Sequence, residues 1–348
     1  MNKPRYRSTS LCAVLGLLVL SCLAWLPPAV SADTSVIVSR IEVPVRLSDG
    51  NVYTVAGYLY IAPTNIRHRT LQLLVHGATY DHRYWDGPTI NGIDYSYARN
   101  MARRGYVLFA IDQLGSGASS KPDGDFFNLA EAASALHQVA QGIRLIAPGG
   151  CDKLAYVGHS NGSLTAISAQ ATYGDADGLV TTGWDHPFHP VPIDPNDPAI
   201  QEAFSHPYVD LGGPLQPVRE GLFYFAPGSA SDPAAIAFDS ANLANTMPRA
   251  QFLDLLGITI DIASRGPGGM TALTKSQGVR VPVLVQVGDH DVIAPSSAAL
   301  AAPTERAFYP ASPDFELQLL TNIGHGVNLH FAHEASWDGI DRWLQRVF

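Results

Sequence analysis

Short apolar runs alternate with longer helical patterns along most of the chain. Apolar runs bounded by turn residues are typical of buried strands, and apolar positions that recur every three or four residues are typical of helices. The pattern predicts strands at Val36–Leu47, Val52–Ile61, Leu71–Val75, Tyr106–Ile111, Leu154–Val157, Leu179–Gly183, Val281–Val287 and Phe315–Leu320. It predicts helices at Tyr95–Arg104, Leu129–Ile146, Asn161–Tyr173 and about Leu329–Arg346. This order indicates an α/β domain with a largely parallel sheet, whose first two strands form an antiparallel edge pair.

The alternation stops between Asp185 and Gly278. This segment is rich in Pro and Gly, and it contains two possible helices, at Pro233–Asn245 and Pro248–Ile262. A structureless loop of this length does not suit a compact domain, so we expect an inserted subdomain or lid. The predicted organisation is a core in two parts, 33–184 and 280–348, with an insertion at 185–279.

The first 32 residues have the composition of a cleavable signal peptide. Lys3, Arg5 and Arg7 precede the apolar stretch Leu11–Leu26, and the small residues of Val30-Ser31-Ala32 follow it. We therefore expect export, with a mature chain that begins near Asp33. The apolar stretch is short of the roughly 20 residues of a spanning helix, so no stable membrane insertion is expected once the leader is removed.

Composition and charge exclude several classes of protein. The chain is 46% hydrophobic and only 15% charged, unlike a disordered or coiled-coil protein. Its formal net charge is -9 and it has no basic run, which argues against nucleic-acid binding. Loss of the leader would leave Cys151 as the one cysteine, so we expect neither an intrachain disulfide nor a multi-cysteine metal site.

A sequence of the nucleophile-elbow type follows the fifth strand. Gly158-His159-Ser160-Asn161-Gly162 lies between the strand Leu154–Val157 and the helix Asn161–Tyr173. In this context a serine is held on a strained turn at the carboxyl edge of the sheet, and the glycines permit the tight backbone. Ser160 is therefore the candidate nucleophile. His159 belongs to the elbow pattern, and we expect it to pack beside the nucleophile and to take no part in catalysis.

A serine hydroxyl needs a base to take its proton, and the base needs a third group to orient it. His325, between two glycines after the last strand, is the candidate base. Three acids compete for the third role. Asp291 fits best, Asp289 lies two residues earlier and could cap the turn, and Asp185 closes the sixth strand.

Two backbone N–H groups complete the candidate site. His76-Gly77-Ala78 comes directly after an apolar strand, so the N–H of Ala78 can point at a reacting carbonyl. The N–H of Asn161, the residue after the nucleophile, is the expected second donor of an oxyanion hole.

These motifs resemble the α/β-hydrolase fold superfamily over nearly the whole chain outside the leader and the insertion. The resemblance rests on His76-Gly77, the loop Asp112–Ser119, the elbow at Ser160, the acid turn at Asp291 and His325. It implies an eight-stranded sheet, a lid after the sixth strand, and cofactor-free cleavage of a carboxylic ester or lactone. Amide or C–C bond cleavage, non-hydrolytic chemistry and a ligand-binding role on the same scaffold stay open, and the substrate and oligomeric state are not predicted.

Two groups of histidines suit metal binding by spacing alone: Asp185, His186 and His189, and His330, His333 and Glu334. Neither follows a known zinc pattern, so we expect exposed polar residues and no metal. The insertion is also aromatic, with Phe188, Phe204, Tyr208, Phe223, Tyr224, Phe225 and Phe238. These rings either face a neutral, apolar substrate or form the insertion's own core. If the insertion roofs Ser160, substitutions such as Phe225→Ala should change acyl-chain selectivity.

Overall fold

The computed structural model describes residues 35–147, 151–186, 194, 196–243, 246–265, 275–294 and 303–348. The predicted leader, Phe188 and His189 lie outside these residues. Strands and helices alternate as the sequence pattern predicts, and every predicted core strand is present.

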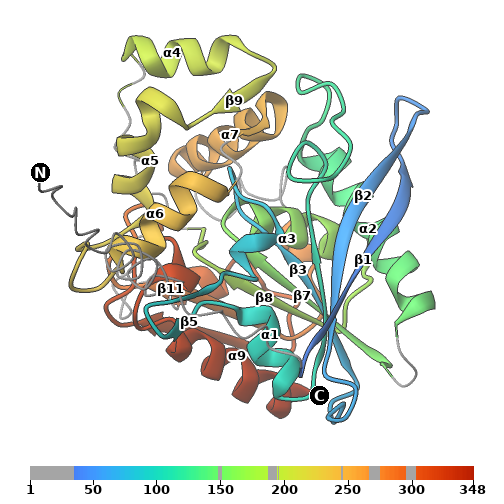
Figure 1. The fold of residues 1–348 in the computed structure, drawn as a ribbon. Coiled ribbons are helices and arrows are strands. Elements are labelled where there is room, and N and C mark those ends of the chain that lie inside the picture. The colour runs from blue at the N-terminus through green and yellow to red at the C-terminus, as the bar shows by residue number, and fades with distance from the viewer. Residues whose placement is uncertain are drawn as a thin grey trace, which may run out of the picture. The chain divides into compact units, whose positions relative to one another are not determined.

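An eight-stranded, mostly parallel sheet forms the centre of the domain (Figure 1). The strand order is β1-β2-β6-β3-β7-β8-β11-β12, and β2 runs antiparallel to both of its neighbours. The strands are β1 Ile37–Arg46, β2 Val52–Ile61, β3 Thr70–Val75, β6 Val107–Ile111, β7 Lys153–His159, β8 Gly178–Thr182, β11 Val283–Gly288 and β12 Phe315–Leu320. The predicted fold class and edge pair are confirmed.

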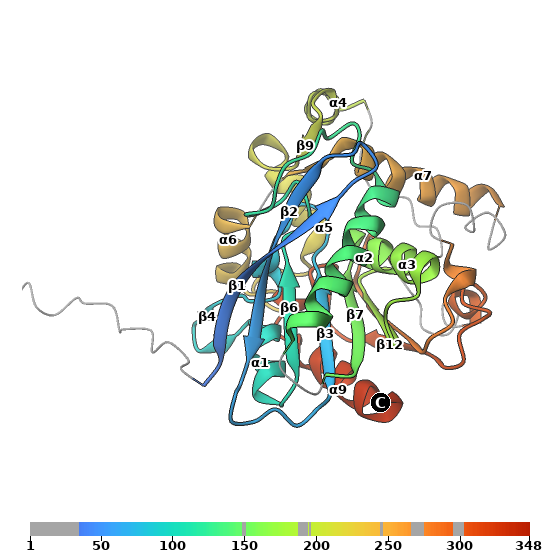
Figure 2. The same cartoon turned by 90° about the vertical axis from the view of Figure 1, so that its right-hand side faces the viewer.

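Both faces of the sheet are buried, because side chains that alternate along the central strands pack into a core on each face. In β6, Val107, Phe109 and Ile111 pack into one core, while Leu108 and Ala110 pack into the other. The first core includes residues of α2 (Leu129–Ile146) and α3 (Asn161–Tyr173), and the second includes residues of α1 (Tyr97–Arg103) and α9 (Glu334–Val347) (Figure 2). Strands covered on both faces carry continuous apolar runs, which is why the sequence revealed them so clearly.

Side-chain caps mark the starts of α1 and α2. Asn128 accepts the N–H of Glu131 at the start of α2, and Ser96 accepts that of Arg99 at the start of α1.

The predicted start of the last helix was wrong. Residues Val327–Leu329 form a 3₁₀ turn, and α9 begins only at Glu334. None of the helices in the described part of the chain combines the length and apolarity that a membrane-spanning segment requires.

The segment between β8 and β11 holds more structure than the two helices that we predicted. Both of those are present, as α6 Pro233–Asn242 and α7 Arg249–Arg265. The segment also forms α4 Pro198–Ser205, α5 Gln216–Phe223, and a strand pair of β9 Tyr208–Asp210 with β10 Thr246–Pro248. Both views draw these elements together beyond one end of the sheet (Figures 1 and 2). Three-residue strands carry too little periodicity to be found in the sequence.

Candidate active site

Ser160 occupies a strained turn between β7 and α3. Its φ is 51° and its ψ is -121°, a region that non-glycine residues seldom adopt. A Cβ on Gly158 would lie 2.6 Å from Ser163 Cα, and one on Gly162 would overlap the carbonyl oxygen of Val75. The two glycines therefore allow strand and helix to approach closely enough to hold Ser160 in this conformation.

His325 links Ser160 to Asp291. Its Nε2 lies 2.8 Å from Ser160 Oγ, and its Nδ1 lies 2.9 Å from Asp291 Oδ2 and 3.1 Å from Oδ1. At most 7% of any of the three residues is exposed, so water competes little for these hydrogen bonds. A Nδ1 proton directed at the carboxylate leaves Nε2 free to accept the proton of the serine.

Of the three competing acids, Asp291 is the one that contacts the imidazole. Its Oδ1 also accepts the backbone N–H groups of Ile293 and Ala294 at 2.8 and 2.9 Å, which fixes the carboxylate. Asp289 Oδ1 instead accepts the N–H of Ile323 at 3.3 Å, the loop-holding role that its position suggested. Asp185 is buried at the end of β8, but the ring nitrogens of His325 contact Ser160 and Asp291.

The loop after β3 lies directly beside the serine. A Cβ on Gly77 would be 3.1 Å from Ser160 Cβ, so the backbone of this loop borders the nucleophile. Within the described part of the chain, neither Ala78 nor Asn161 donates a backbone hydrogen bond. Both N–H groups are therefore available to an oxygen atom bound next to Ser160.

A narrow, apolar cavity of about 70 Å³ opens next to Ser160. The core contributes Ala78, Trp184 and Ile293, and the insertion contributes Leu211, Leu222, Phe223, Phe252, Leu255 and Leu256. The described residues that line it include no charged side chain. Because α5 and α7 supply half of the lining residues, the insertion shapes the space available to a bound molecule.

The aromatic residues of the insertion do not share one role. Phe223 lines the cavity, whereas Phe204 packs edge-on against Phe252 with ring centroids 4.9 Å apart. Phe225 is not among the cavity residues and stacks on His290 at 3.6 Å. Of the insertion's aromatic residues, Phe223, which the sequence analysis named, and Phe252, which it did not, line the cavity, so the expectation for Phe225 has no support from its position.

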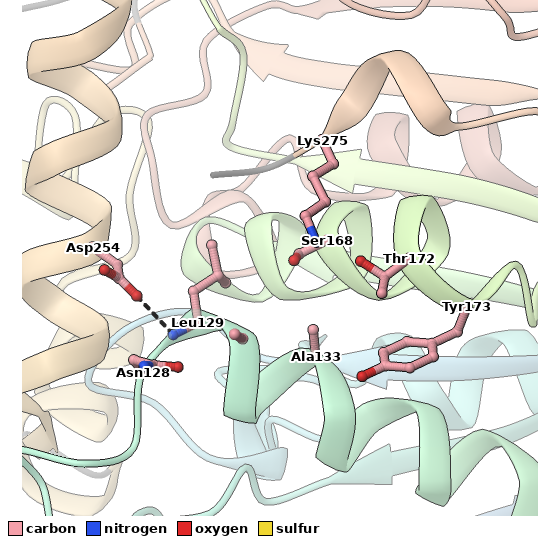
Figure 3. Close-up of a pocket in the computed structure, with 9 residues that line it drawn as sticks. Asn128, Leu129, Ala133, Ser168, Thr172, Tyr173, Asp254 and Lys275 are labelled. Atoms are coloured by element: carbon pink, nitrogen blue, oxygen red, sulfur yellow. Dashed lines mark hydrogen bonds between the residues drawn. The ribbon is translucent and has the colours of Figure 1, made fainter. Parts of the chain in front are cut away.

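Helix α7, which carries Phe252, is attached to the core by a polar contact (Figure 3). Asp254 Oδ2 accepts the N–H of Leu129 at 2.8 Å, at the positive N-terminal end of α2. The contact borders a separate hollow of about 340 Å³, which shares no lining residue with the Ser160 cavity. One side of the insertion is thus held to the core at α2.

His159 packs beside the site, as its position in the elbow predicted. It is fully buried, and its ring stacks on Tyr84 with centroids 4.3 Å apart. Burial lowers the pKa of His159 well below its usual value, and nearby His325 adds to this effect. His159 is therefore neutral and places no charge next to the candidate base.

The expectation that the clustered histidines are exposed was wrong. His186, His330 and His333 are all buried, and His330 precedes the last helix. His330 Nε2 accepts the N–H groups of Gly324 and Phe225 at 3.0 and 3.2 Å, and Nδ1 lies 2.9 Å from the carbonyl oxygen of Gly326. His330 thus holds both neighbours of His325. An amphipathic pattern alone could not have revealed this contact.

Each of the three buried histidines in these clusters has at least one protein partner. Both nitrogens of His330 are hydrogen-bonded, and His186 Nδ1 lies 2.6 Å from Glu305. One further group, Asp81, His82 and Asp112, has ligand atoms within 4.8 Å of one another. Its carboxylates already bind Arg83 and His82. His186 Nε2 and His333 Nε2 are buried without a hydrogen-bond partner, but within the described residues neither predicted cluster brings three ligand atoms close enough together to hold an ion.

We expect acid to destabilise the protein through His330. Burial lowers the pKa of His330 from 6.5 to about 4, so only the unfolded chain takes up this proton as the pH falls from 6.5 to 4. The free energy of unfolding should then drop by about 3 kcal/mol through this group. Urea unfolding at pH 7.5, 5.5 and 4.5 gives the free energy of unfolding of the wild type and of His330→Gln, and this free energy should fall more steeply with decreasing pH in the wild type. If it falls equally steeply in both proteins, His330 is not the source of the acid sensitivity.

A protein-family model described as "Serine aminopeptidase, S33" matches residues 90–329, which is more than half of the chain. The match spans the elbow, the acid turn and His325. A search of curated proteins finds no match to this chain.

Solved structures of ester-cleaving enzymes share the fold. A soluble variant of monoglyceride lipase from Saccharomyces cerevisiae is 17% identical with a TM-score of 0.61, over 87% of this chain and 96% of the lipase. A thermophilic esterase from Thermogutta terrifontis is 17% identical with a TM-score of 0.54, over 89% and 99%. A monoacylglycerol lipase from Paleococcus ferrophilus is 16% identical with a TM-score of 0.56, over 88% and 98%. At these identities the likeness establishes the fold.

Proposed function

The chain belongs to the serine aminopeptidase S33 family of α/β hydrolases, and we propose that it is a secreted serine hydrolase of carboxylic esters or lactones. One observation carries the proposal. A buried imidazole lies within hydrogen-bond distance of both a strained serine and a buried carboxylate. That arrangement activates a hydroxyl nucleophile, and a binding protein would have no use for it.

In the proposed acylation, Ser160 Oγ attacks the carbonyl carbon of the substrate while His325 Nε2 takes the hydroxyl proton. Asp291 keeps the Nδ1 proton in place and stabilises the imidazolium that forms. The carbonyl oxygen becomes an oxyanion and accepts the N–H groups of Ala78 and Asn161. His325 then gives its proton to the leaving alkoxide, which departs as an alcohol.

Deacylation repeats the sequence with water. His325 takes a proton from a water molecule, whose oxygen attacks the acyl carbon bound to Ser160. The second tetrahedral intermediate collapses when the proton returns to Ser160 Oγ, which releases the carboxylic acid. The cycle requires no metal or cofactor, because the protons and the acyl group move only among the substrate, water and these residues.

The cavity favours a neutral acyl group over the N-terminus of a peptide. An aminopeptidase has to recognise an α-ammonium group, and a buried positive charge requires a charged or strongly polar partner. The described residues around the cavity are apolar apart from Ser160 itself and the indole N–H of Trp184. The same residues complement the hydrocarbon part of an ester.

A comparison of substrates and an inhibitor tests the proposed function. The wild type should hydrolyse p-nitrophenyl butyrate, while leucine p-nitroanilide should react at least about a hundredfold more slowly. A serine-directed fluorophosphonate should add one phosphonyl group, detected by intact mass and located on Ser160. Labelling without ester turnover would overturn the assignment to esters but keep the nucleophile. The absence of both would overturn the proposed function.

The size of the cavity predicts a preference for short acyl chains. A volume of about 70 Å³ is far below the roughly 300 Å³ at which ligand pockets usually begin. Phe252→Ala should therefore raise kcat/KM for p-nitrophenyl octanoate, relative to the acetate, by about tenfold. A ladder of p-nitrophenyl esters from acetate to dodecanoate measures this change in rank.

Phe225→Ala is the matched control for that series, because Phe225 is an insertion aromatic that lies against His290 outside the cavity. It should change all the esters in parallel and leave their rank unaltered. If Phe252→Ala also leaves the rank unaltered, the insertion does not select the acyl chain.

The secreted character of the proposed enzyme rests on the leader. Expression of the full chain in a host that processes signal peptides should give an exported product whose mass corresponds to a start near Asp33. An exported product that keeps Met1 would contradict cleavage.

A further inference from the structure

Arg219, on α5, is a fully buried charge that the proposed chemistry does not use. None of its surface is exposed, and its Nη1 and Nη2 each lie 2.8 Å from an oxygen of Asp239, on α6. A buried guanidinium is tolerated only where its charge and hydrogen bonds are met. The carboxylate of Asp239 binds the edge of the guanidinium formed by Nη1 and Nη2. The edge formed by Nε and Nη2 is left to bind another group.

The rest of the guanidinium binds the loop of the oxyanion hole. Arg219 Nε lies 3.2 Å from Thr79 Oγ1, and Nη2 lies 3.2 Å from the carbonyl oxygen of Thr79. Thr79 directly follows Ala78, one of the two proposed donors. Its φ is 57°, a left-handed conformation that costs a non-glycine residue roughly 1–3 kcal/mol unless its surroundings enforce it. Arg219 thus binds both the hydroxyl and the carbonyl oxygen of this strained residue.

The other end of the loop is held from within the core. Gln113 N–H donates to His76 Nε2 at 3.0 Å, and Gln113 Nε2 donates to the carbonyl oxygen of His76 at 2.7 Å. Gly77 and Ala78 therefore lie between two polar anchors. The first belongs to the core, and the second belongs to the insertion.

Aromatic rings fix the position of the guanidinium. Its central carbon lies 5.0 Å from the centroid of Tyr80 and 4.8 Å from that of Phe223. Contacts of this kind suit a planar, weakly hydrated cation. A lysine has neither the planar fork nor the reach to bind Asp239 and Thr79 at the same time.

We propose that Arg219 is a positioning residue that holds Thr79, and through it the N–H of Ala78, in the orientation that receives the oxyanion. This inference rests on the proposed function and extends it, because it makes the insertion part of the catalytic unit in addition to a wall of the cavity. Helix α5, which belongs to the insertion, thus acts as a fixed brace for the oxyanion loop.

Arg219→Lys tests the proposal. It should lower kcat for p-nitrophenyl butyrate by about a hundredfold, the order of effect seen when an oxyanion donor is lost, while KM changes less than threefold. Affinity for a boronic acid, which forms a tetrahedral adduct on the serine, should fall by a similar factor. Tyr224→Phe is the control, because Tyr224 donates to the same carboxylate of Asp239, and its hydroxyl has no hydrogen bond with Thr79 in the described part of the chain. It should leave all three quantities within about threefold of the wild type.

A second pair of variants decides the matter if Arg219→Lys fails to fold. Thr79→Ala removes the hydroxyl that Arg219 binds and should lower both kcat and boronate affinity by about fivefold. Thr79→Ser keeps the hydroxyl and should restore both.

A folded Arg219→Lys with the kcat of the wild type would overturn the proposal. So would a loss of kcat without a loss of boronate affinity, or equal losses in Thr79→Ala and Thr79→Ser. Failure of the wild type itself to react with esters or fluorophosphonate would instead refute the proposed function.

Discussion

Replacement of Ser160 by alanine should lower kcat/KM for an activated ester by about 10⁵-fold or more, because the covalent route through the acyl-enzyme is lost. KM and folding should change little, since the alanine removes one oxygen atom whose hydrogen-bond partner in the structure is His325. Steady-state kinetics with p-nitrophenyl butyrate measure kcat/KM and KM, and near-UV circular dichroism checks the folding.

Ser163→Ala is the matched control for this experiment. Ser163 is a buried serine on α3, the helix that directly follows Ser160, and its hydroxyl donates to the carbonyl oxygen of Thr182 at 3.3 Å. It should retain a rate within about tenfold of the wild type. If Ser160→Ala kept more than about a tenth of the wild-type rate while Ser163→Ala lost it, the nucleophile would have to be reassigned.

The second large effect concerns the acid. Asp291→Asn should lower kcat on the order of 10⁴-fold, because an amide in this place favours the wrong tautomer of His325. Asparagine Oδ1 can still accept the N–H groups of Ile293 and Ala294, so the turn should keep its shape. The measurement is kcat against pH, since a wrong tautomer lowers the whole profile.

Asp289→Asn and Asp185→Asn are the comparisons, because the sequence offered both residues as alternatives. Neither should lower kcat by more than about tenfold, since the imidazole of His325 contacts Asp291. A crippled Asp185→Asn beside an active Asp291→Asn would move the acid to the end of β8. The roles proposed for Ser160 and His325 would survive that result.

The insertion was the part of the chain for which sequence reasoning lost most accuracy. Two of its helices were predicted, α6, which begins at Pro233, and α7, which begins directly after Pro248. The cavity wall was not, since the choice of Phe252 over Phe225 depends on how α7 lies on the core. Asp254 helps to set that placement through the end of α2, a contact across 125 residues that no local pattern encodes.

Buried polar residues were misread for a related reason. The sequence pattern put His330 on an exposed helix surface, and it offered no role for Arg219. Both are buried because distant partners satisfy them: Phe225 is 105 residues from His330, and Thr79 is 140 residues from Arg219. Sequence alone assigns such residues to the surface, since burial of a polar group is favourable only once its partner is in place.

The sequence by itself determined the sheet and the edge at which the chemistry would meet. Short stretches of consecutive residues specify the apolar strands, the glycine-flanked turns and the strand-turn-helix around Ser160. Parallel strands then bring their carboxyl ends to one edge of the sheet. Tertiary structure alone decided which of the three acids contacts His325 and which side chains line the cavity. It also decided that Arg219 of the insertion binds Thr79 in the loop after β3. The physical reason is range: periodicity and turn chemistry act over a few residues, whereas packing and buried hydrogen bonds join residues that only the completed fold brings together.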